Sequence, residues 1–146
     1  KMPAWVDQAY QDYAKRLPRQ QAVTLSCIAT AARKSGHPVE RLQQQEAAKI
    51  RDKIKPGSLT IALDEHGRQW TTREWAQQYA DWQQHQSQVN FILGGPDGLA
   101  PDLLRQAGHR IALGKMTLPH GLARVVLIEQ LYRAWTITQN HPYHRA

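Results

Sequence analysis

The sequence GKMTLPH at residues 114–120 leads into a long apolar segment, residues 121–138. This loop and the segment after it are the part of the chain around which the fold is predicted. Apolar residues in the segment recur at the i, i+3 and i+7 spacing of an α-helix and also fill the neighbouring row, so the predicted helix has a wide apolar stripe. Glu129 and Arg133 lie four apart in the order that favours an ion pair. A helix that packed only on its own sheet would need a narrower stripe. The additional apolar width suggests that the helix packs against a second partner, most simply another copy of the chain.

Upstream of this helix, strand-like runs alternate with amphipathic segments. Four short apolar or alternating runs predict strands, namely residues 23–27, 59–63, 89–93 and 110–113. Further helices are predicted over residues 3–18, 39–55, 71–82 and 101–107. Thr71 and Glu74 have the capping-box spacing, and Trp75, Tyr79 and Trp82 form a stripe typical of core residues. The alternation predicts an α/β domain, residues 1–146, with a parallel sheet covered by helices on both faces.

The composition indicates the kind of partner. The 19 Lys and Arg residues against 12 Asp and Glu give a net charge of +7, which favours a polyanion such as nucleic acid. A basic soluble protein without a polyanionic ligand is the alternative. One cysteine, Cys27, excludes an internal disulfide framework and fits a reducing cytoplasm. No apolar run approaches the roughly 20 residues that span a bilayer, and no signal peptide is visible, so we expect a cytoplasmic protein without a membrane segment.

Three unusual loops follow predicted strands, at residues 64–67, 94–98 and 114–120. In an open parallel sheet, ligands bind at the carboxyl ends of the strands, and glycine allows a backbone to approach a ligand closely. The sequence GGPDG at 94–98 is neither a dinucleotide fingerprint nor a phosphate-binding P-loop, because the GxGxxG spacing and the P-loop lysine are both missing. A tight turn without a ligand is the alternative for this loop taken alone.

Six spaced motifs together resemble one family. They are KMPAW at 1–5, ALDE at 62–65, FILGGPDG at 91–98, MTLPH at 116–120, EQLYRA at 129–134 and PYHR at 142–145. In this order and at this total length they strongly resemble the RlmH (YbeA) family, SPOUT-class methyltransferases that modify N3 of a pseudouridine in 23S ribosomal RNA. The resemblance covers nearly the whole chain.

The resemblance implies an α/β sheet whose C-terminal part is threaded into a trefoil knot, and a homodimer that acts on 23S rRNA in the assembled ribosome. It also implies S-adenosylmethionine as the cofactor. The positions that match the family's cofactor site are Leu63, Gly94, Gly95, Leu113, Gly114, Lys115, Met116, Thr117 and Leu118. Two departures stand out. The family begins with a hydrophobic strand before the KMP motif, and that first strand is missing here. The loop after residue 112 lacks the serines that flank its leucine in the family.

The implied reaction moves a methyl group from a sulfonium to a ring nitrogen, so the N3 proton must be removed. His144 is the candidate general base, because imidazole titrates near neutral pH. Tyr143 is expected to stack on or hydrogen-bond to the base, and Arg145 to hold a phosphate or the imide oxygens. An uninvolved chain end is the alternative.

Three basic residues are candidate RNA contacts: Arg33, Lys34 and Arg124. For Arg33 and Lys34 an ordinary solvated loop is the alternative, and for Arg124 a role in the dimer. His120, His141 and His144 suggest a metal site, but no cysteine or carboxylate completes it in the same stretch, so none is predicted. Two rival functions stay open: a non-catalytic RNA-binding or ribosome-assembly factor on the same fold, and an enzyme acting on a small nucleotide.

Overall fold

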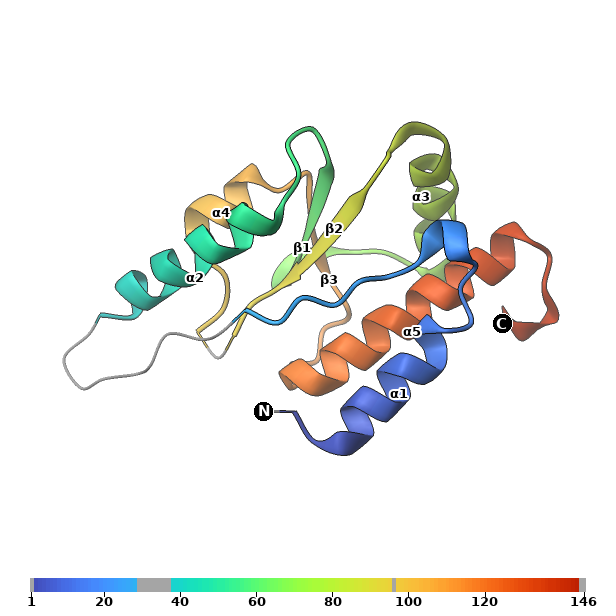
Figure 1. Cartoon of the computed structure of the whole chain (residues 1–146), viewed down its shortest axis with the longest axis horizontal. Coiled ribbons are helices and arrows are strands. Elements are labelled where there is room, and N and C mark those ends of the chain that lie inside the picture. Colours follow the sequence, from blue (N-terminus) through green and yellow to red (C-terminus); the bar gives the residue numbers. More distant parts are fainter. Residues whose placement is uncertain (1, 29–37, 96, 145–146) are drawn as a thin grey trace.

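The computed structural model describes residues 2–28, 38–95 and 97–144, which form a sheet with helices on both faces (Figure 1). The three strands are β1 (Leu59–Gln69), β2 (Val89–Leu93) and β3 (His109–Ala112), all parallel and in the order β2-β1-β3. The α-helices are α1 (Ala4–Ala14), α2 (Val39–Lys53), α3 (Thr72–His85), α4 (Pro101–Gln106) and α5 (His120–Thr138). Two 3₁₀ turns, η1 (Arg19–Gln21) and η2 (Pro142–His144), complete the described elements.

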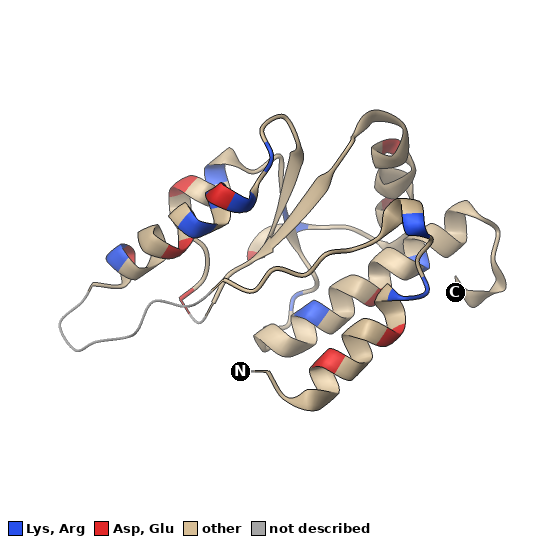
Figure 2. Ribbon diagram, in the orientation of Figure 1, with Lys and Arg blue, Asp and Glu red and all other residues tan. Residues whose placement is uncertain are grey.

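Successive residues of β1 supply two cores, one on each face of the sheet. Ile61 belongs to the core built with α1, α3 and α5, whereas Ala62 belongs to the core built with α2 and α4. This alternation follows from the twofold side-chain period of a strand. The predicted α/β class is therefore confirmed. The charged positions of α2 carry both signs, as expected for a helix with a solvated outer face (Figure 2).

The helix α3 begins where the capping box predicted it. Thr71 Oγ1 accepts a hydrogen bond from the Glu74 backbone N–H at 3.1 Å, and the Glu74 carboxylate accepts one from the Thr71 N–H at 2.9 Å. The aromatic stripe of Trp75, Tyr79 and Trp82 is buried in the core, as predicted.

The long helix α5 packs against both α1 and α3 and buries residues around much of its circumference. The predicted ion pair forms, with Arg133 Nη2 at 2.6 Å from Glu129 Oε2. The rest of the chain buries Leu127, Ile128 and Leu131 of the wide apolar stripe, whereas Val125, Val126 and Trp135 stay half-buried. Part of the stripe is thus covered within the chain, and a second copy over the remainder stays a prediction.

Two local predictions were wrong. Residues 22–28 are extended, but they pair with no strand in the described part of the chain, so the alternating pattern at 23–27 gives no β-strand and the described residues form three strands rather than four. Residues 64–67 are not a turn, because β1 continues through them to Gln69 with a register shift against β3 between Leu63 and Arg68. Strand β3 also begins and ends one residue earlier than predicted.

Gly67, in the segment of residues 64–67, allows a close approach of two backbones. A Cβ on Gly67 would lie 2.6 Å from the carbonyl carbon of Arg110, on β3. Asp64 pairs with the same neighbour, its carboxylate lying 2.7 Å from the Arg110 guanidinium. The polar residues that looked like a turn thus belong to a strand irregularity. No helix among the described residues is both long and apolar enough to cross a bilayer.

Candidate functional site

The ends of β2 and β3, together with Leu63 where β1 becomes irregular, bring most of the predicted cofactor residues to one edge of the sheet. Leu63 on β1 is the register partner of Leu93 on β2 and of Ile111 on β3. Gly94 and Gly95 follow β2 directly, and the loop of residues 113–118 follows β3. The arrangement is the one in which open parallel sheets bind ligands.

The glycine loop is shaped by close backbone packing. A Cβ on Gly94 would lie 2.6 Å from the Gly98 carbonyl carbon and 2.7 Å from the Leu99 nitrogen. Gly98 has a φ of 76°, which favours glycine, and its N–H donates to the Gly95 carbonyl at 3.0 Å. On the α2 side, Gln43 donates to the Asp97 carbonyl at 2.6 Å. The loop therefore has a defined shape before any ligand is considered.

The loop after β3 is more open. Lys115, Met116 and Thr117 are exposed, Met116 with 79% of its surface accessible, whereas Leu113, Gly114 and Leu118 are half-buried. The backbone groups of residues 114–118 make no hydrogen bond to other backbone groups of the described chain. A Cβ on Gly114 would meet no atom within 4 Å. Leucine side chains beside free amides and carbonyls can hold a flat heterocycle by apolar contact and hydrogen bonds.

The helix α5 begins against the glycine loop. His120 Nδ1 lies 3.0 Å from the carbonyl oxygen of Gly94, and His120 Nε2 lies 3.1 Å from the guanidinium of Arg124. Arg124 is only 9% exposed. The predicted RNA contact is thus a buried side chain in this chain, and its contact with RNA stays a prediction.

The C-terminal tail folds back on the later turns of α5. The Tyr143 hydroxyl donates to Glu129 Oε2 at 2.8 Å, and its ring packs edge-on against Tyr132 with 4.6 Å between centroids. The Arg133 guanidinium lies over the same ring at 5.1 Å. Burial raises the pKa of Tyr143, and the carboxylate of Glu129 raises it further, so the phenol stays protonated as a hydrogen-bond donor.

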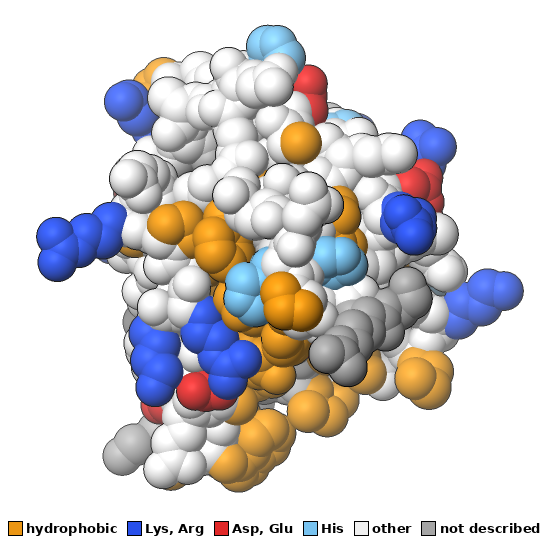
Figure 3. Space-filling model, turned by 90° about the vertical axis from the view of Figure 1, so that its right-hand side faces the viewer, with side chains coloured by type: hydrophobic (Ala, Val, Ile, Leu, Met, Phe, Trp, Pro, Cys, Tyr) orange, Lys and Arg blue, Asp and Glu red, His pale blue; other side chains and the backbone are white. Residues whose placement is uncertain are grey.

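His144 lies at the far end of the same helix. Its Nδ1 is buried and has no hydrogen-bond partner in the described part of the chain. The side chain borders a cavity of about 90 Å³ together with Thr72, Arg73 and Ile137. Hydrophobic and histidine side chains gather at the middle of the face that contains the tail (Figure 3). Arg145, Arg33 and Lys34 lie outside the described residues.

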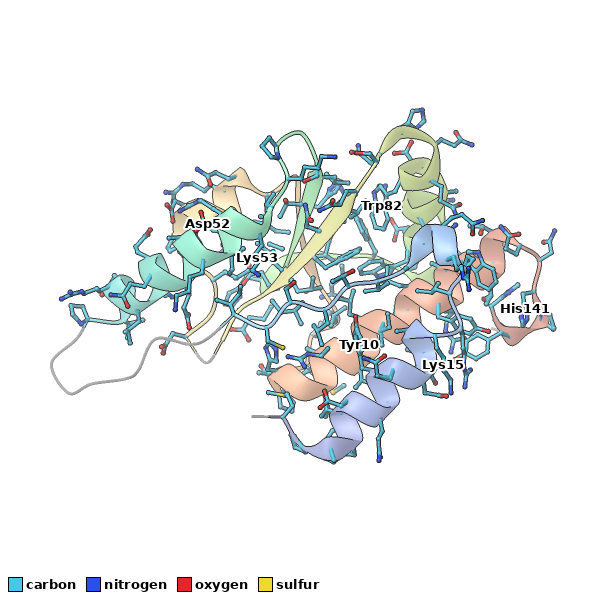
Figure 4. All side chains as sticks on the ribbon, in the orientation of Figure 1. Tyr10, Lys15, Asp52, Lys53, Trp82 and His141 are labelled. Atoms are coloured by element: carbon cyan, nitrogen blue, oxygen red, sulfur yellow. The ribbon has the colours of Figure 1, made fainter. Side chains whose placement is uncertain are left out.

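The predicted cofactor residues and the predicted base are far apart within one chain. Gly94 bonds to His120 at the start of α5, whereas His144 adjoins Ile137, seventeen positions further along the helix (120 to 137). At a rise of about 1.5 Å per residue this is about 26 Å. Figure 4 shows the tail residue His141 beyond the C-terminal end of α5. One chain therefore does not bring the tail to the strand-end loops.

Comparison with known proteins gives the family. Residues 1–144 match a family model described as a predicted SPOUT methyltransferase. The chain belongs to the SPOUT methyltransferase family. Curated relatives named ribosomal RNA large subunit methyltransferase H are 47% identical in Burkholderia cenocepacia strain HI2424 and Burkholderia multivorans, and 46% in Burkholderia vietnamiensis. Each alignment covers the whole chain and 94% of the relative.

In this SPOUT methyltransferase the sequence did not reveal the pairing of His120 with Gly94 and Arg124. The sequence offers His120 only as one of three histidines near the C-terminus, and among the described residues no group of three His, Cys, Asp or Glu side chains is placed to hold an ion. The i, i+4 spacing of His120 and Arg124 was a signal only once the helix was known to begin at His120, one residue before the predicted start at 121.

Proposed function

We propose that this chain is an S-adenosylmethionine-dependent methyltransferase that methylates N3 of a pseudouridine in 23S rRNA, on the assembled ribosome in the cytoplasm. The observation that carries the proposal is the full-length match to relatives whose names specify methylation of large-subunit ribosomal RNA. The net charge of +7 supports a polyanionic substrate. Arg33 and Lys34 are the proposed contacts to RNA phosphates.

The strand-end loops suit the proposed cofactor. Leu63, Leu113 and Leu118 offer apolar contact to an adenine ring, and the free backbone groups of residues 114–118 offer the hydrogen bonds. Gly94, Gly95, Gly114, Lys115, Met116 and Thr117 complete the proposed lining. S-adenosylmethionine supplies a methyl group on a sulfonium, which is electrophilic without further activation. Membership of the SPOUT family supports a C-terminal trefoil knot around this site.

The proposed chemistry on the target belongs to the tail. His144 takes the N3 proton, and its buried, unpartnered Nδ1 supports this assignment because no hydrogen bond in the described chain competes for the nitrogen. Arg145 stabilises the imide anion left behind. Tyr143, bonded to Glu129, anchors the tail so that its neighbours are held in place.

A homodimer is part of the proposal, and the separation of about 26 Å along α5 between the tail of one chain and its own glycine loop supports it. A second copy whose α5 runs in the opposite direction would place its tail beside the loops of the first. We propose that the active site combines the loops of one chain with the tail of its partner.

Transfer of a labelled methyl group to ribosomes that lack the modification tests the proposed function. The expected product is one methylated pseudouridine in 23S rRNA. Binding of S-adenosylmethionine without transfer to any RNA would contradict this function, and RNA binding without cofactor binding would favour the assembly-factor alternative.

Complementation of two inactive variants tests the shared site. Gly114→Tyr fills open space in the cofactor loop, and His144→Ala removes the base. Each variant should be inactive alone. A mixture of equal amounts should recover about a quarter of wild-type activity, because half of the dimers are mixed and each has one intact site. A site built within one chain would give no recovery, since every chain in the mixture carries a defect.

A further inference from the structure

We propose that His120 is a positioning residue that holds the glycine loop in its cofactor-binding shape. It acts as a neutral imidazole, with the proton on Nδ1, that ties the Gly94 carbonyl to the buried guanidinium of Arg124. The inference rests on the proposed function, in which Gly94 and Gly95 contact S-adenosylmethionine.

The chemistry of the two partners determines the tautomer. The Gly94 carbonyl, 3.0 Å from Nδ1, can only accept a hydrogen bond, so Nδ1 must carry a proton. The Arg124 guanidinium, 3.1 Å from Nε2, can only donate, so Nε2 must present its lone pair. A doubly protonated His120 would direct an N–H at a cation. Both contacts are satisfied by one form of the imidazole alone.

The burial of Arg124 explains why the second contact matters. The residue is 9% exposed, and it forms no ion pair with the described residues. A buried cation without a hydrogen-bond acceptor is costly. Tyr10, where α1 packs on α5 (Figure 4), offers no anion, because burial raises the pKa of its phenol even though the charge of Arg124 opposes that rise. The Nε2 lone pair is therefore an important acceptor for Arg124.

The hydrogen bond from His120 to the Gly94 carbonyl connects the imidazole held by Arg124 to the glycine loop. Because a trans peptide unit is planar, holding the Gly94 carbonyl fixes the orientation of the peptide that joins Gly94 to Gly95. The loop is then held from both layers of helices, by His120 on the α5 side and by the bond from Gln43 to the Asp97 carbonyl on the α2 side. Two anchors on opposite faces of the sheet suit a loop that must keep its shape while a ligand enters and leaves.

Two substitutions separate the two hydrogen bonds. In His120→Asn the side-chain amide nitrogen takes the place of Nδ1 and keeps the bond to Gly94, whereas in His120→Gln the amide oxygen takes the place of Nε2 and keeps the bond to Arg124. Calorimetric titration with S-adenosylmethionine should show binding weakened about three- to tenfold in His120→Gln and rescued to within about twofold of wild type in His120→Asn. At saturating cofactor, kcat should be unchanged while KM for S-adenosylmethionine rises in His120→Gln. Equal affinity in His120→Gln and wild type would overturn the inference.

Nitrogen NMR of the wild-type imidazole supplies a test that needs neither a variant nor a cofactor. The expected spectrum shows a protonated Nδ1 and an unprotonated Nε2 for His120, and Arg124→Met should lose this preference. A protonated Nε2 in the folded wild-type chain would overturn the inference. Absence of cofactor binding by wild type, together with the expected tautomer, would instead refute the proposed function.

Discussion

Gly94→Ala tests whether the shape of the glycine loop depends on close backbone packing. The added Cβ would lie 2.6 Å from the carbonyl carbon of Gly98 and 2.7 Å from the nitrogen of Leu99, both backbone atoms. Ordinary van der Waals contact begins at 3.4 Å, so the two strands of the loop must separate by about 0.8 Å. Strain of this kind costs about 1–3 kcal/mol of unfolding free energy. A displacement above about 0.5 Å also spoils a preorganised site, so we expect weaker cofactor binding.

Gly114→Ala is the matched control for stability, because its Cβ meets nothing within 4 Å and lies in the neighbouring loop. Urea denaturation should show a loss of about 1–3 kcal/mol for Gly94→Ala and no loss for Gly114→Ala. Calorimetric titration of Gly94→Ala and of wild type with S-adenosylmethionine measures the effect on binding. If Gly94→Ala were as stable as wild type and bound the cofactor equally well, the loop would tolerate the separation and the packing argument would fail.

Three further predictions concern stability and the tail. Thr71→Ala removes half of the capping box and should lower the unfolding free energy in urea by about 1 kcal/mol, whereas intact stability would mean that the cap contributes nothing. The hydrogen bond from Gln44 is the largest cause of the lowered pKa of Asp102, from a reference value of 3.8. A carboxyl whose pKa falls on folding stabilises the fold above its unfolded pKa, and this contribution disappears as the pH falls through the folded pKa. Urea titrations between roughly pH 5 and pH 2 should therefore show that the unfolding free energy changes less steeply with pH in Asp102→Asn than in wild type. An unchanged pH dependence would exclude a contribution from this carboxyl. Glu129→Gln and Tyr143→Phe should be coupled by about 1 kcal/mol in a double-mutant cycle of unfolding free energies, and strict additivity would show that the tail is not held by this bond.

Local patterns in the sequence predicted local structure correctly. The capping box of Thr71 and Glu74 and the ion pair of Glu129 and Arg133 each involve residues within one turn of a helix, so their spacing contains the whole interaction. The runs at 59–63 and 89–93 predicted strands for a similar reason, because continuous apolar runs are typical of a sheet that is covered on both faces.

The predictions that were wrong concern structure that depends on residues distant in the sequence. Residues 23–27 alternate as a strand should, but a strand also needs a hydrogen-bonded partner, and the described sheet ends at β2 without pairing with them. Gly67 looked like a turn glycine, whereas its lack of a side chain allows β1 to approach the backbone of Arg110. Neither spacing nor composition of the local segment distinguishes these cases. The contact of His120 is not predictable from its local segment for the same reason, since its partner Gly94 is 26 residues away.

The geometry of α5 restricts where the tail of a chain can act. From His120 to Thr138 the helix rises about 27 Å, and the six residues from Thr138 to His144 span at most about 22 Å when fully extended. Even when fully extended, a tail released from Glu129 would leave the His144 Cα about 5 Å short of the level of the glycine loop, and a closer approach would need α5 to unwind. Unwinding would expose Leu127, Ile128 and Leu131, which are buried against the rest of the chain. If this tail acts at these loops, as proposed, we expect it to be the tail of a second copy, and dilution below the dimer dissociation constant should then abolish transfer.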